Sequence, residues 1–197
     1  MTSKPPIDPV AAEKAALRRA ALDRRDEIPA EHRAAAAAAI AARPLPVPVT
    51  AGTVVSGYMA IRSELDPAPL MRRFVENGTG LALPVVRGRG QPLAFRAWAP
   101  GVPLVTAGFG LLEPAPEAPE VVPDVLLVPL ACFDRTGHRI GYGAGHYDTT
   151  LAALRAERPV VAIGIAFAAQ EIARVPANGR DARLDLVLTE AEVIDCR

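Results

Sequence analysis

Short apolar runs, separated by polar and glycine-containing stretches, follow one another along the chain from Thr53 onward. Several runs are apolar at consecutive positions, which is typical of strands covered by helices on both faces of a mostly parallel sheet. We therefore predict strands in the runs TVVSGYMA (53–60), LALPVV (81–86), PLAFRAW (92–98), VLLVPLACF (125–133), VVAIGIAF (160–167) and LDLVLTE (184–190).

Two helices are predicted before the first strand. Asp8 followed by Pro9 offers an N-cap and a proline at the first helical position, so one helix is expected from there to about Arg25. Pro29 begins a second helical stretch, EHRAAAAAAIAAR (31–43), which the prolines after it would end. We expect residues 1–8 to be frayed.

Two further helices are predicted between the strands. The segment DPAPLMRRFVENG (66–78) has apolar residues at helical spacing and a glycine at its end, and TTLAALRAERP (149–159) is also helical in pattern. Strands that alternate with helices indicate a layered α/β fold. The proline-rich stretch EPAPEAPEVVP (113–123) is interpreted as a surface connection, because neither flank could form a core alone. We therefore predict a single domain over residues 1–197.

The overall charge is balanced, with 22 basic and 22 acidic side chains in 197 residues. No global field favours nucleic acid or an anionic membrane as a partner, so we expect neither. Only two cysteines are present, and no apolar run has the length of a membrane span. We interpret the chain as a cytoplasmic protein of 20.7 kDa, large enough to bury a core without disulfides.

The segment DRTGHRIGYGAGHYDTTL (134–151) carries four glycines and an unusual density of tyrosine, histidine and aspartate. It follows an apolar run and precedes a helix, which places it at the carboxyl end of a strand, where open α/β sheets bind ligands. The main-chain amides of Gly141, Gly143 and Gly145, together with the start of the helix, could hold a phosphate. Neither common nucleotide-binding glycine motif is present. A glycine-rich turn that only lets strand and helix pack is the alternative.

Three aspartates are candidate ligands of Mg²⁺, an ion that takes one or two protein carboxylates together with phosphates and waters. Asp148 lies in the expected first turn of the helix after the glycine segment, where it could equally be a cap. Asp181 and Asp185 precede or open the last predicted strand, and Asp185 could be a solvated strand-end carboxylate. The spacing alone does not choose between these readings.

Two cations lie four residues apart near the amino terminus, Lys14 and Arg18. On a helix they project from one face and could grip a polyphosphate, or they could belong to an ordinary solvated basic face.

Glu64 follows the first predicted strand, which also carries Tyr58 and Met59. A carboxylate there could bind the amino-pyrimidine edge of a pterin through two parallel hydrogen bonds, or it could cap the next helix. His32 is expected to be exposed on a helix, whereas His138 and His146 belong to the glycine segment. No spacing of histidine and cysteine resembles a zinc site.

Several pieces of the sequence, taken in order, resemble the 5-formyltetrahydrofolate cyclo-ligase family, also called methenyltetrahydrofolate synthetases. The most specific match is the signature F-D-x-x-G-x-R-[LI]-G-x-G-x-G-x-Y-D over residues 133–148. The resemblance extends from about Lys14 to Glu190 and includes KAALR (14–18), YMAIRSELD (58–66), LALPVV (81–86), GFGLLEP (108–114) and VPANGRDARLDLVLTE (175–190).

The resemblance implies a three-layer α/β/α sandwich with a mostly parallel sheet. It also implies a ligase that uses ATP and Mg²⁺ to close 5-formyltetrahydrofolate to 5,10-methenyltetrahydrofolate, with release of ADP and phosphate. We expect a monomer that acts on these small molecules.

The roles that the resemblance implies are carried over by motif position. Lys14 and Arg18 match contacts of the ATP phosphates, Asp148 and Asp181 match the magnesium pair, and Asp181 is preferred over Asp185 on family position alone. Met59 and Glu64 match folate contacts, together with Tyr142 and His146, which lie between folate and nucleotide. The implied nucleotide cradle consists of Arg139, Gly141, Tyr142, Gly143, Ala144, Gly145, His146 and Tyr147, of which Arg139 and Tyr147 are the predicted catalytic residues.

Three residues depart from the family pattern. His146 stands where many members have tyrosine, Ala144 where glycine or lysine is frequent, and Thr149 where arginine is common. We expect altered pterin contacts rather than lost activity, because histidine can still stack and donate a hydrogen bond. Two other functions remain open, a non-catalytic folate- or nucleotide-binding paralogue and an isomerase or transferase acting on a sugar phosphate or thioester.

Overall fold

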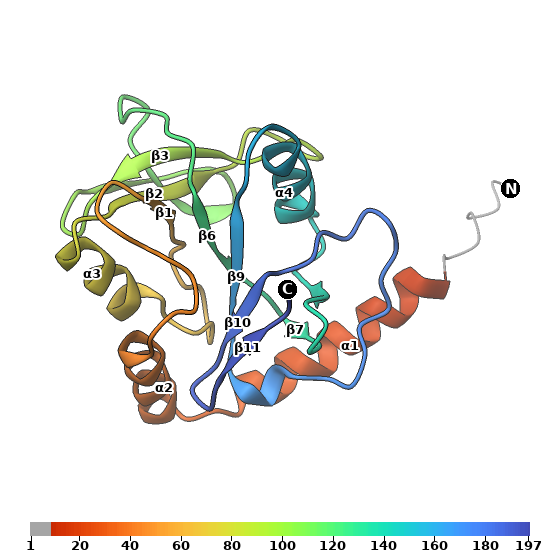
Figure 1. Cartoon of the computed structure of the whole chain (residues 1–197). Helices are drawn as coiled ribbons and strands as arrows, with labels where there is room; N and C mark the ends of the chain where they lie inside the picture. The colour runs from red at the N-terminus through yellow and green to blue at the C-terminus, as the bar shows by residue number, and fades with distance from the viewer. Residues whose placement is uncertain (1–8) are drawn as a thin grey trace, which may run out of the picture.

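A seven-stranded sheet forms the centre of the molecule, as the computed structural model of residues 9–197 shows (Figure 1). The strand order is β11-β10-β9-β6-β1-β2-β3. The five inner strands are parallel, and the two edge strands β3 and β11 run antiparallel to their neighbours. The strands are β1 (Val54–Ser56), β2 (Gly80–Val85), β3 (Ala94–Trp98), β6 (Val125–Pro129), β9 (Val161–Ile165), β10 (Leu186–Leu188) and β11 (Val193–Asp195).

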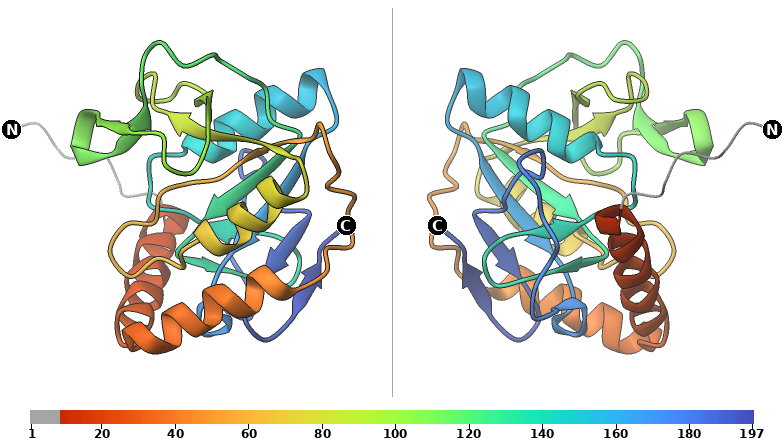
Figure 2. Two further views of the ribbon diagram at one scale, coloured as in Figure 1. Left: turned by 90° about the vertical axis from the view of Figure 1, so that its left-hand side faces the viewer. Right: turned by 90° about the vertical axis from the view of Figure 1, so that its right-hand side faces the viewer.

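Helices cover both faces of this sheet and make the three predicted layers (Figure 2). Helices α2 (Ala30–Ala42) and α3 (Ala68–Glu76) pack on one face, and α4 (His146–Glu157) packs on the other. Successive residues of β6 point to opposite sides, so Leu127 faces α2 and α3 whereas Leu126 faces α4. Burial on both faces explains why the inner strands read as continuous apolar runs.

Helix α1 (Pro9–Asp26) stands apart from these layers and packs on the short hairpin of β7 (Cys132–Phe133) and β8 (Arg139–Ile140). A small apolar cluster joins the two, with Ala21 of the helix against Cys132 and Ile140 of the hairpin. The helix thereby runs beside the glycine segment that follows β8.

The strand and helix predictions are confirmed except in a few places. Tyr58 and Met59 do not lie on a strand, because β1 ends at Ser56 and the chain leaves the sheet after the Gly57 N–H group bonds the Ala82 carbonyl at 2.9 Å. The run 125–133 is divided between β6 and β7. The hairpin of β4 (Leu104–Thr106) and β5 (Leu112–Pro114), the 3₁₀ turns η1 (Gly108–Gly110) and η2 (Ala168–Gln170), and strands β8 and β11 were not predicted.

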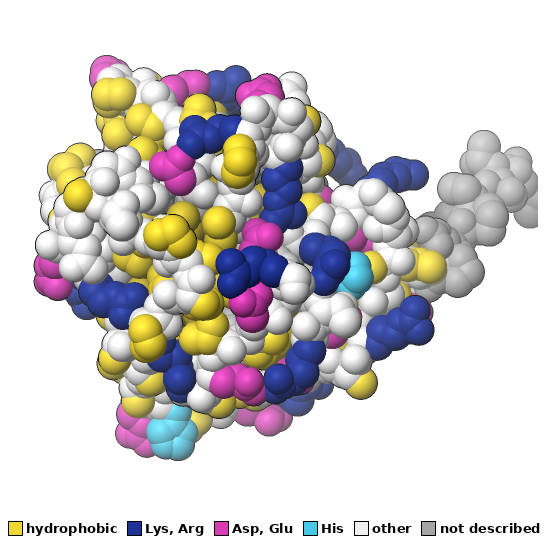
Figure 3. Space-filling model, viewed as in Figure 1, with side chains coloured by type: hydrophobic (Ala, Val, Ile, Leu, Met, Phe, Trp, Pro, Cys, Tyr) yellow, Lys and Arg dark blue, Asp and Glu magenta, His cyan; other side chains and the backbone are white. Residues whose placement is uncertain are grey.

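Basic and acidic side chains are interspersed on the face shown in Figure 3, in keeping with the balanced charge of the sequence. None of the helices within residues 9–197 combines the length and apolarity needed to cross a membrane. The expectations for residues 1–8, the fraying and the Asp8 cap, lie outside the described residues.

Candidate functional site

A cavity of about 580 Å³ opens at the carboxyl ends of strands β1, β2 and β6. Its walls come from the segments that follow these strands, from α1, from the hairpin β4–β5 and from the glycine segment. Every residue that the sequence analysis predicted for the site lines this cavity: Lys14, Arg18, Met59, Glu64, Arg139, Gly141, Tyr142, Gly143, Ala144, Gly145, His146, Tyr147, Asp148 and Asp181. A cavity of this volume has the size of a small-molecule site.

The glycine loop, residues 141–145, is shaped by backbone conformations that favour glycine. Gly143 has φ +100° and Gly145 has φ +71°, and Gly145 immediately precedes α4. A side chain at either position would be strained in this left-handed region. Arg18, which also lines the cavity, holds the loop in place, because its Nε donates to the Gly141 carbonyl at 2.6 Å. The loop therefore faces the cavity with its main chain and with the amino-terminal end of a 12-residue helix.

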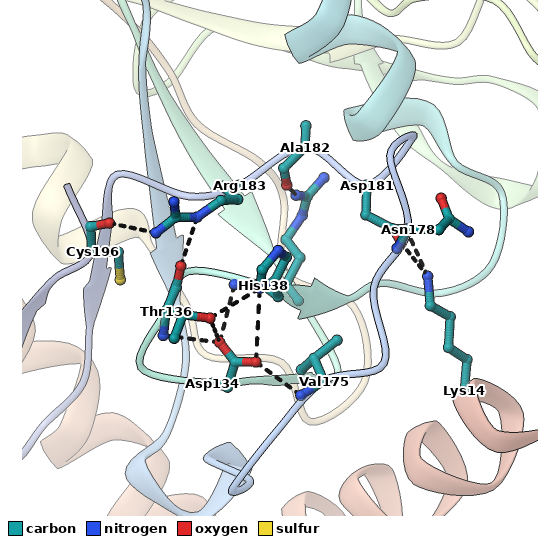
Figure 4. Close-up of polar contacts among 11 residues, drawn as sticks. Lys14, Asp134, Thr136, His138, Val175, Asn178, Asp181, Ala182, Arg183 and Cys196 are labelled. Atoms are coloured by element: carbon teal, nitrogen blue, oxygen red, sulfur yellow. Dashed lines mark hydrogen bonds and ion pairs between the residues drawn. The ribbon is translucent and has the colours of Figure 1, made fainter. Parts of the chain in front are cut away.

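Two ion pairs join the basic and acidic side chains of the site. Lys14 reaches from α1 and donates to both carboxylate oxygens of Asp181, at 2.7 and 2.6 Å (Figure 4). Arg139 is buried, and its Nη2 donates to Asp148 Oδ1 at 2.9 Å while its Nη1 bonds the Ala182 carbonyl. The Ala182 N–H group donates to the same Asp148 oxygen at 3.1 Å, so the residue next to Asp181 touches Asp148 directly.

The Asp181 carboxyl is charged in this arrangement. Burial acts to raise the pKa of Asp181, but hydrogen bonds from Lys14 and the Asn178 N–H group outweigh it and hold the pKa below its usual value. Burial lowers the pKa of Arg139, and Asp148 opposes that effect. Arginine has so high an intrinsic pKa that the guanidinium remains protonated.

The carboxylates of Asp148 and Asp181 could hold a magnesium ion that arrives with a phosphate and displaces Lys14, whose Nζ bonds both Asp181 oxygens, but they do not form a cage of their own. Both contacts of Asp148 within the described chain use Oδ1, which leaves Oδ2 for a cation. No group of three or more histidine, cysteine, aspartate or glutamate side chains gathers anywhere in residues 9–197 to hold a metal. Two carboxylates with phosphate and water ligands are a usual set for Mg²⁺.

Glu64 also lines the cavity and is 8% exposed. The Ile61 N–H group donates to Glu64 Oε2 at 2.9 Å. Burial raises the pKa of the Glu64 carboxyl, and interactions with Tyr142, the Ile61 N–H group and Arg25 act in the opposite direction. Glu64 does not cap the next helix, because Asp66 accepts the Ala68 N–H group there. The Glu64 carboxylate is therefore available to a ligand in the cavity.

The two aromatic residues before Asp148 also contribute polar groups. Burial raises the pKa of Tyr147 well above its ordinary value, so the side chain remains a protonated phenol that can donate a hydrogen bond. The Nδ1 atom of His146 is buried and has no hydrogen-bond partner among residues 9–197.

The remaining candidates have structural roles. Asp185 accepts Arg155 Nη2 at 2.6 Å and the Ala162 N–H group at 2.7 Å, so it ties the start of β10 to α4 and β9, and it does not line the cavity. His32 is exposed on α2, as predicted. His138 lies outside the cavity, with Nδ1 2.9 Å from Thr136 Oγ1.

Asp134 is a buried residue that the sequence analysis did not single out, although it belongs to the signature. Its Oδ1 accepts the Thr136 N–H and hydroxyl groups and the His138 N–H group at 2.9, 2.6 and 3.2 Å. Its Oδ2 accepts the Val175 N–H group at 2.8 Å. Asp134 therefore joins the hairpin that carries Arg139 to the segment that carries Asp181, as Figure 4 shows.

Some residues that line the cavity were also missed. Glu113 accepts the Val86 N–H group at 3.0 Å and ties β5 to the end of β2. Leu83, Leu111 and Leu112 add apolar surface to the wall. The fragment GFGLLEP belonged to the family resemblance, but apart from Glu113 its residue types carry no chemistry that would mark them as site residues.

Known proteins with similar sequences all point to one family. A sequence model of the 5-formyltetrahydrofolate cyclo-ligase family matches residues 10–190. A 5-formyltetrahydrofolate cyclo-ligase from Mycolicibacterium smegmatis is 36% identical over 146 residues, which are 70% of this chain and 74% of that protein. The enzyme of the same name from Escherichia coli K12 is 30% identical over 151 residues, 74% of this chain and 82% of that protein.

A solved structure agrees with these sequence matches. The NMR structure of 5,10-methenyltetrahydrofolate synthetase from Aquifex aeolicus superimposes with a TM-score of 0.77 at 28% identity and covers 93% of both chains. The matched region contains the whole glycine loop and all the ion pairs of the cavity. The chain therefore belongs to the 5-formyltetrahydrofolate cyclo-ligase family and is an enzyme of the ligase class.

Proposed function

We propose that the chain closes 5-formyltetrahydrofolate to 5,10-methenyltetrahydrofolate, uses ATP and Mg²⁺, and releases ADP and phosphate. The observation that carries the proposal is the shared cavity. Lys14, Arg18 and Arg139, the glycine loop, two carboxylates and the buried Glu64 all line one space of about 580 Å³. Residues that suit a phosphate and a residue that suits a pterin edge therefore line one cavity.

The reaction needs ATP because a formamide does not cyclise readily by itself. Its oxygen is a poor leaving group and its carbon a poor electrophile. Transfer of the γ-phosphoryl group to the formyl oxygen makes that oxygen a good leaving group. The N-10 nitrogen can then add to the carbon, and departure of phosphate leaves the conjugated bridge. Phosphoryl transfer depends mainly on positioning and on neutralising charge, so no nucleophilic side chain is required.

The basic residues of the cavity suit the phosphate half of this reaction. Lys14 and Arg18 come from successive turns of α1, and the glycine loop offers main-chain donors between them and α4. Arg139 is held rigidly by the Ala182 carbonyl and Asp148, so its charge is fixed at the cavity wall. Mg²⁺ held by Asp148 and Asp181 would neutralise phosphate charge and make the phosphorus more electrophilic.

Each ion pair of the site contains one cation that would bind phosphate and one acid that would bind the metal ion. The two cations that would bind phosphate, Lys14 and Arg139, are paired with the two acids that would bind the metal. Phosphate alone would leave two acids without partners, and a metal alone would leave two cations without partners. A bound pair of phosphate and metal satisfies all four groups, which favours their joint entry.

The folate half of the cavity contains Glu64, Met59, Tyr142 and His146. The Glu64 carboxylate can accept two parallel N–H groups from an amino-pyrimidine ring, and apolar side chains around it can cover the ring faces. The protonated Tyr147 and the charged Arg139 line the same cavity, where they can stabilise the developing phosphate.

We further propose that the reaction takes place in the cytoplasm, in a monomer, on small-molecule substrates only. The two cysteines, Cys132 and Cys196, are buried free thiols, and burial raises the pKa of Cys132 to about 11. Inert, unpaired thiols suit a reducing compartment.

One assay tests the proposed function. Protein, 5-formyltetrahydrofolate, Mg²⁺ and ATP are mixed, and the near-ultraviolet absorbance of the methenyl product is followed, with ATP omitted as the control. We expect a signal that depends on both ATP and Mg²⁺. Binding of both ligands without product would indicate a non-catalytic paralogue, and absence of folate binding would indicate a different substrate.

A further inference from the structure

The two ion pairs of the site differ in how much of each carboxylate they occupy. Both contacts of Asp148 within the described chain use Oδ1, and one of them comes from Arg139 at 2.9 Å. Lys14 instead donates to both oxygens of Asp181, at 2.7 and 2.6 Å (Figure 4). Asp148 therefore offers one oxygen to a ligand, whereas the ammonium group of Lys14 takes both oxygens of Asp181.

The two cations also differ in their freedom to move. Arg139 is buried, and its planar guanidinium is held at two points, by the Ala182 carbonyl and by Asp148. The Lys14 side chain bonds only Asp181 among residues 9–197, and its ammonium group lies at the end of a flexible four-carbon stem. Lys14 and Asp181 line the same cavity as the glycine loop. The ammonium group can therefore turn from the carboxylate to a phosphate in this cavity, whereas Arg139 is fixed.

The position of the Asp181 carboxylate does not depend on Lys14. The Asn178 N–H group donates to Asp181 Oδ2 at 2.7 Å, and the Asp181 N–H group donates back to the Asn178 carbonyl at 3.0 Å. The same segment is fastened to the β7–β8 hairpin, because the Leu184 N–H group bonds the Gly137 carbonyl at 2.8 Å. Departure of Lys14 would leave the carboxylate in place, with a charge that another cation can neutralise.

A divalent cation that binds Asp181 directly competes with the ammonium group of Lys14. We propose that Lys14 closes the carboxylate site to divalent cations that arrive alone and opens it to those that arrive with a nucleotide. Phosphate oxygens give the ammonium group a new partner, whereas a metal ion alone would leave it unpaired. The proposal rests on the proposed function, from which it takes Asp148 and Asp181 as the metal ligands.

Arg18 provides a matched control for the loss of one positive charge. It lies one turn after Lys14 on α1 and lines the same cavity. Its Nε bonds the Gly141 carbonyl at 2.6 Å, and within the described chain no acid forms an ion pair with it. Arg18→Met therefore removes a charge from the cavity without uncovering a carboxylate, whereas Lys14→Met uncovers Asp181.

The test is the binding of Mn²⁺ alone, a paramagnetic ion that takes oxygen ligands as Mg²⁺ does. It is titrated into each variant without nucleotide, and the EPR signal of the unbound ion gives the Kd. We expect Lys14→Met to bind Mn²⁺ at least about tenfold more tightly than the unsubstituted chain, because Asp181 has lost its competing cation. Arg18→Met should stay within about threefold of the unsubstituted chain. Lys14→Arg, which keeps a cation, should bind Mn²⁺ no more tightly than the unsubstituted chain.

A second substitution locates the ion. Adding Asp181→Asn to Lys14→Met should abolish the gain in affinity for Mn²⁺. A gain that survives Asp181→Asn would overturn the proposal, and so would a Lys14→Met chain that binds Mn²⁺ no better than Arg18→Met. Circular dichroism checks that each variant is folded, and Lys14→Gln takes the place of Lys14→Met if the latter does not fold.

The direction of the effect separates this role from a merely structural one. Lys14→Met should strengthen the binding of Mn²⁺ alone and weaken the binding of ATP, whereas a general loosening of the site would weaken both. The titration contains neither ATP nor folate, so it does not depend on catalysis. If the unsubstituted chain makes no product, the proposed function fails and the titration still decides the role of Lys14. If it makes product but Lys14→Met gains no affinity for Mn²⁺, only the present proposal fails.

Discussion

Asp134→Ala is expected to destabilise the chain strongly, although Asp134 lies outside the cavity. The carboxylate is 3% exposed and accepts four hydrogen bonds. Three come from the turn between β7 and β8, and the fourth comes from the Val175 N–H group. Val175 begins the segment that leads to Asp181, so the loss of Asp134 frees that segment from the hairpin that carries Arg139.

The magnitude follows from the donors that would be left without a partner. The Val175 N–H group is buried, and an unsatisfied buried donor costs about 1–3 kcal/mol. The N–H groups of Thr136 and His138 are partly buried, and each loses a bond to a charged group while gaining access to water, at about 1 kcal/mol each. The sum is about 3–5 kcal/mol, which corresponds to a fall in Tm of roughly 10 °C for a domain of this size.

The pH dependence of the stability difference tests the same prediction independently. Burial acts to raise the pKa of Asp134, but the hydrogen bonds from Thr136, Val175 and His138 outweigh it and hold the pKa below 3.8. A depressed pKa in the folded state adds stability above the unfolded value, and this stability disappears as the pH falls through the folded value. The difference between the unsubstituted chain and Asp134→Ala should therefore be full at pH 7 and should shrink below about pH 4.

Urea denaturation followed by circular dichroism measures this difference at each pH. Asp195→Ala is the matched control, because Asp195 also has a depressed pKa, of about 2, but lies at the surface and bonds only Arg197. The control should leave the midpoint unchanged. If Asp134→Ala unfolds at the same urea concentration as the control, the buried hydrogen bonds do not hold the hairpin and the segment together.

Three further substitutions test the site and the packing of the turn between β7 and β8. Lys14→Met should raise the KM for ATP about tenfold or more in steady-state kinetics and leave the KM for the folate unchanged; an unchanged KM for ATP would remove Lys14 from the phosphate site. Asp148→Asn should lower kcat about 100-fold at saturating Mg²⁺ with a much smaller effect on folding, and unfolding with normal activity in the folded fraction would contradict the metal role. Gly137→Ala should lower the urea midpoint more than Gly52→Ala, because both have positive φ but only at Gly137 would the new Cβ lie 2.5 Å from the Leu184 carbonyl oxygen.

The sequence predicted the inner sheet well because its strands are buried on both faces. Runs such as VLLVP and VAIGI are apolar at nearly every position, and the helices between the strands are followed by a glycine or a proline. The missed strands are short and peripheral. Strand β4 has three residues with mostly exposed side chains, and β11 has three residues at the sheet edge, so neither has enough length for a pattern to show.

Site residues that are adjacent in the sequence could be predicted, whereas contacts between distant parts of the chain could not. The glycine loop was predictable because its residues are adjacent in sequence and their composition suits no core. The pair of Lys14 and Asp181 joins positions 167 residues apart, so only family position could bring them together before the fold was known. Arg25 is one of twenty arginines in the chain, and nothing in its neighbours distinguishes a buried arginine from an exposed one. Its burial depends on where α1 packs.

The fate of the formyl oxygen tests the central claim most directly, since the account requires that the cavity brings this oxygen to the γ-phosphoryl group. 5-Formyltetrahydrofolate labelled with ¹⁸O in the formyl group is converted with ATP and Mg²⁺, and the released phosphate is analysed by mass spectrometry. We predict that each phosphate carries one labelled oxygen. Unlabelled phosphate, with the label recovered in water, would contradict the account.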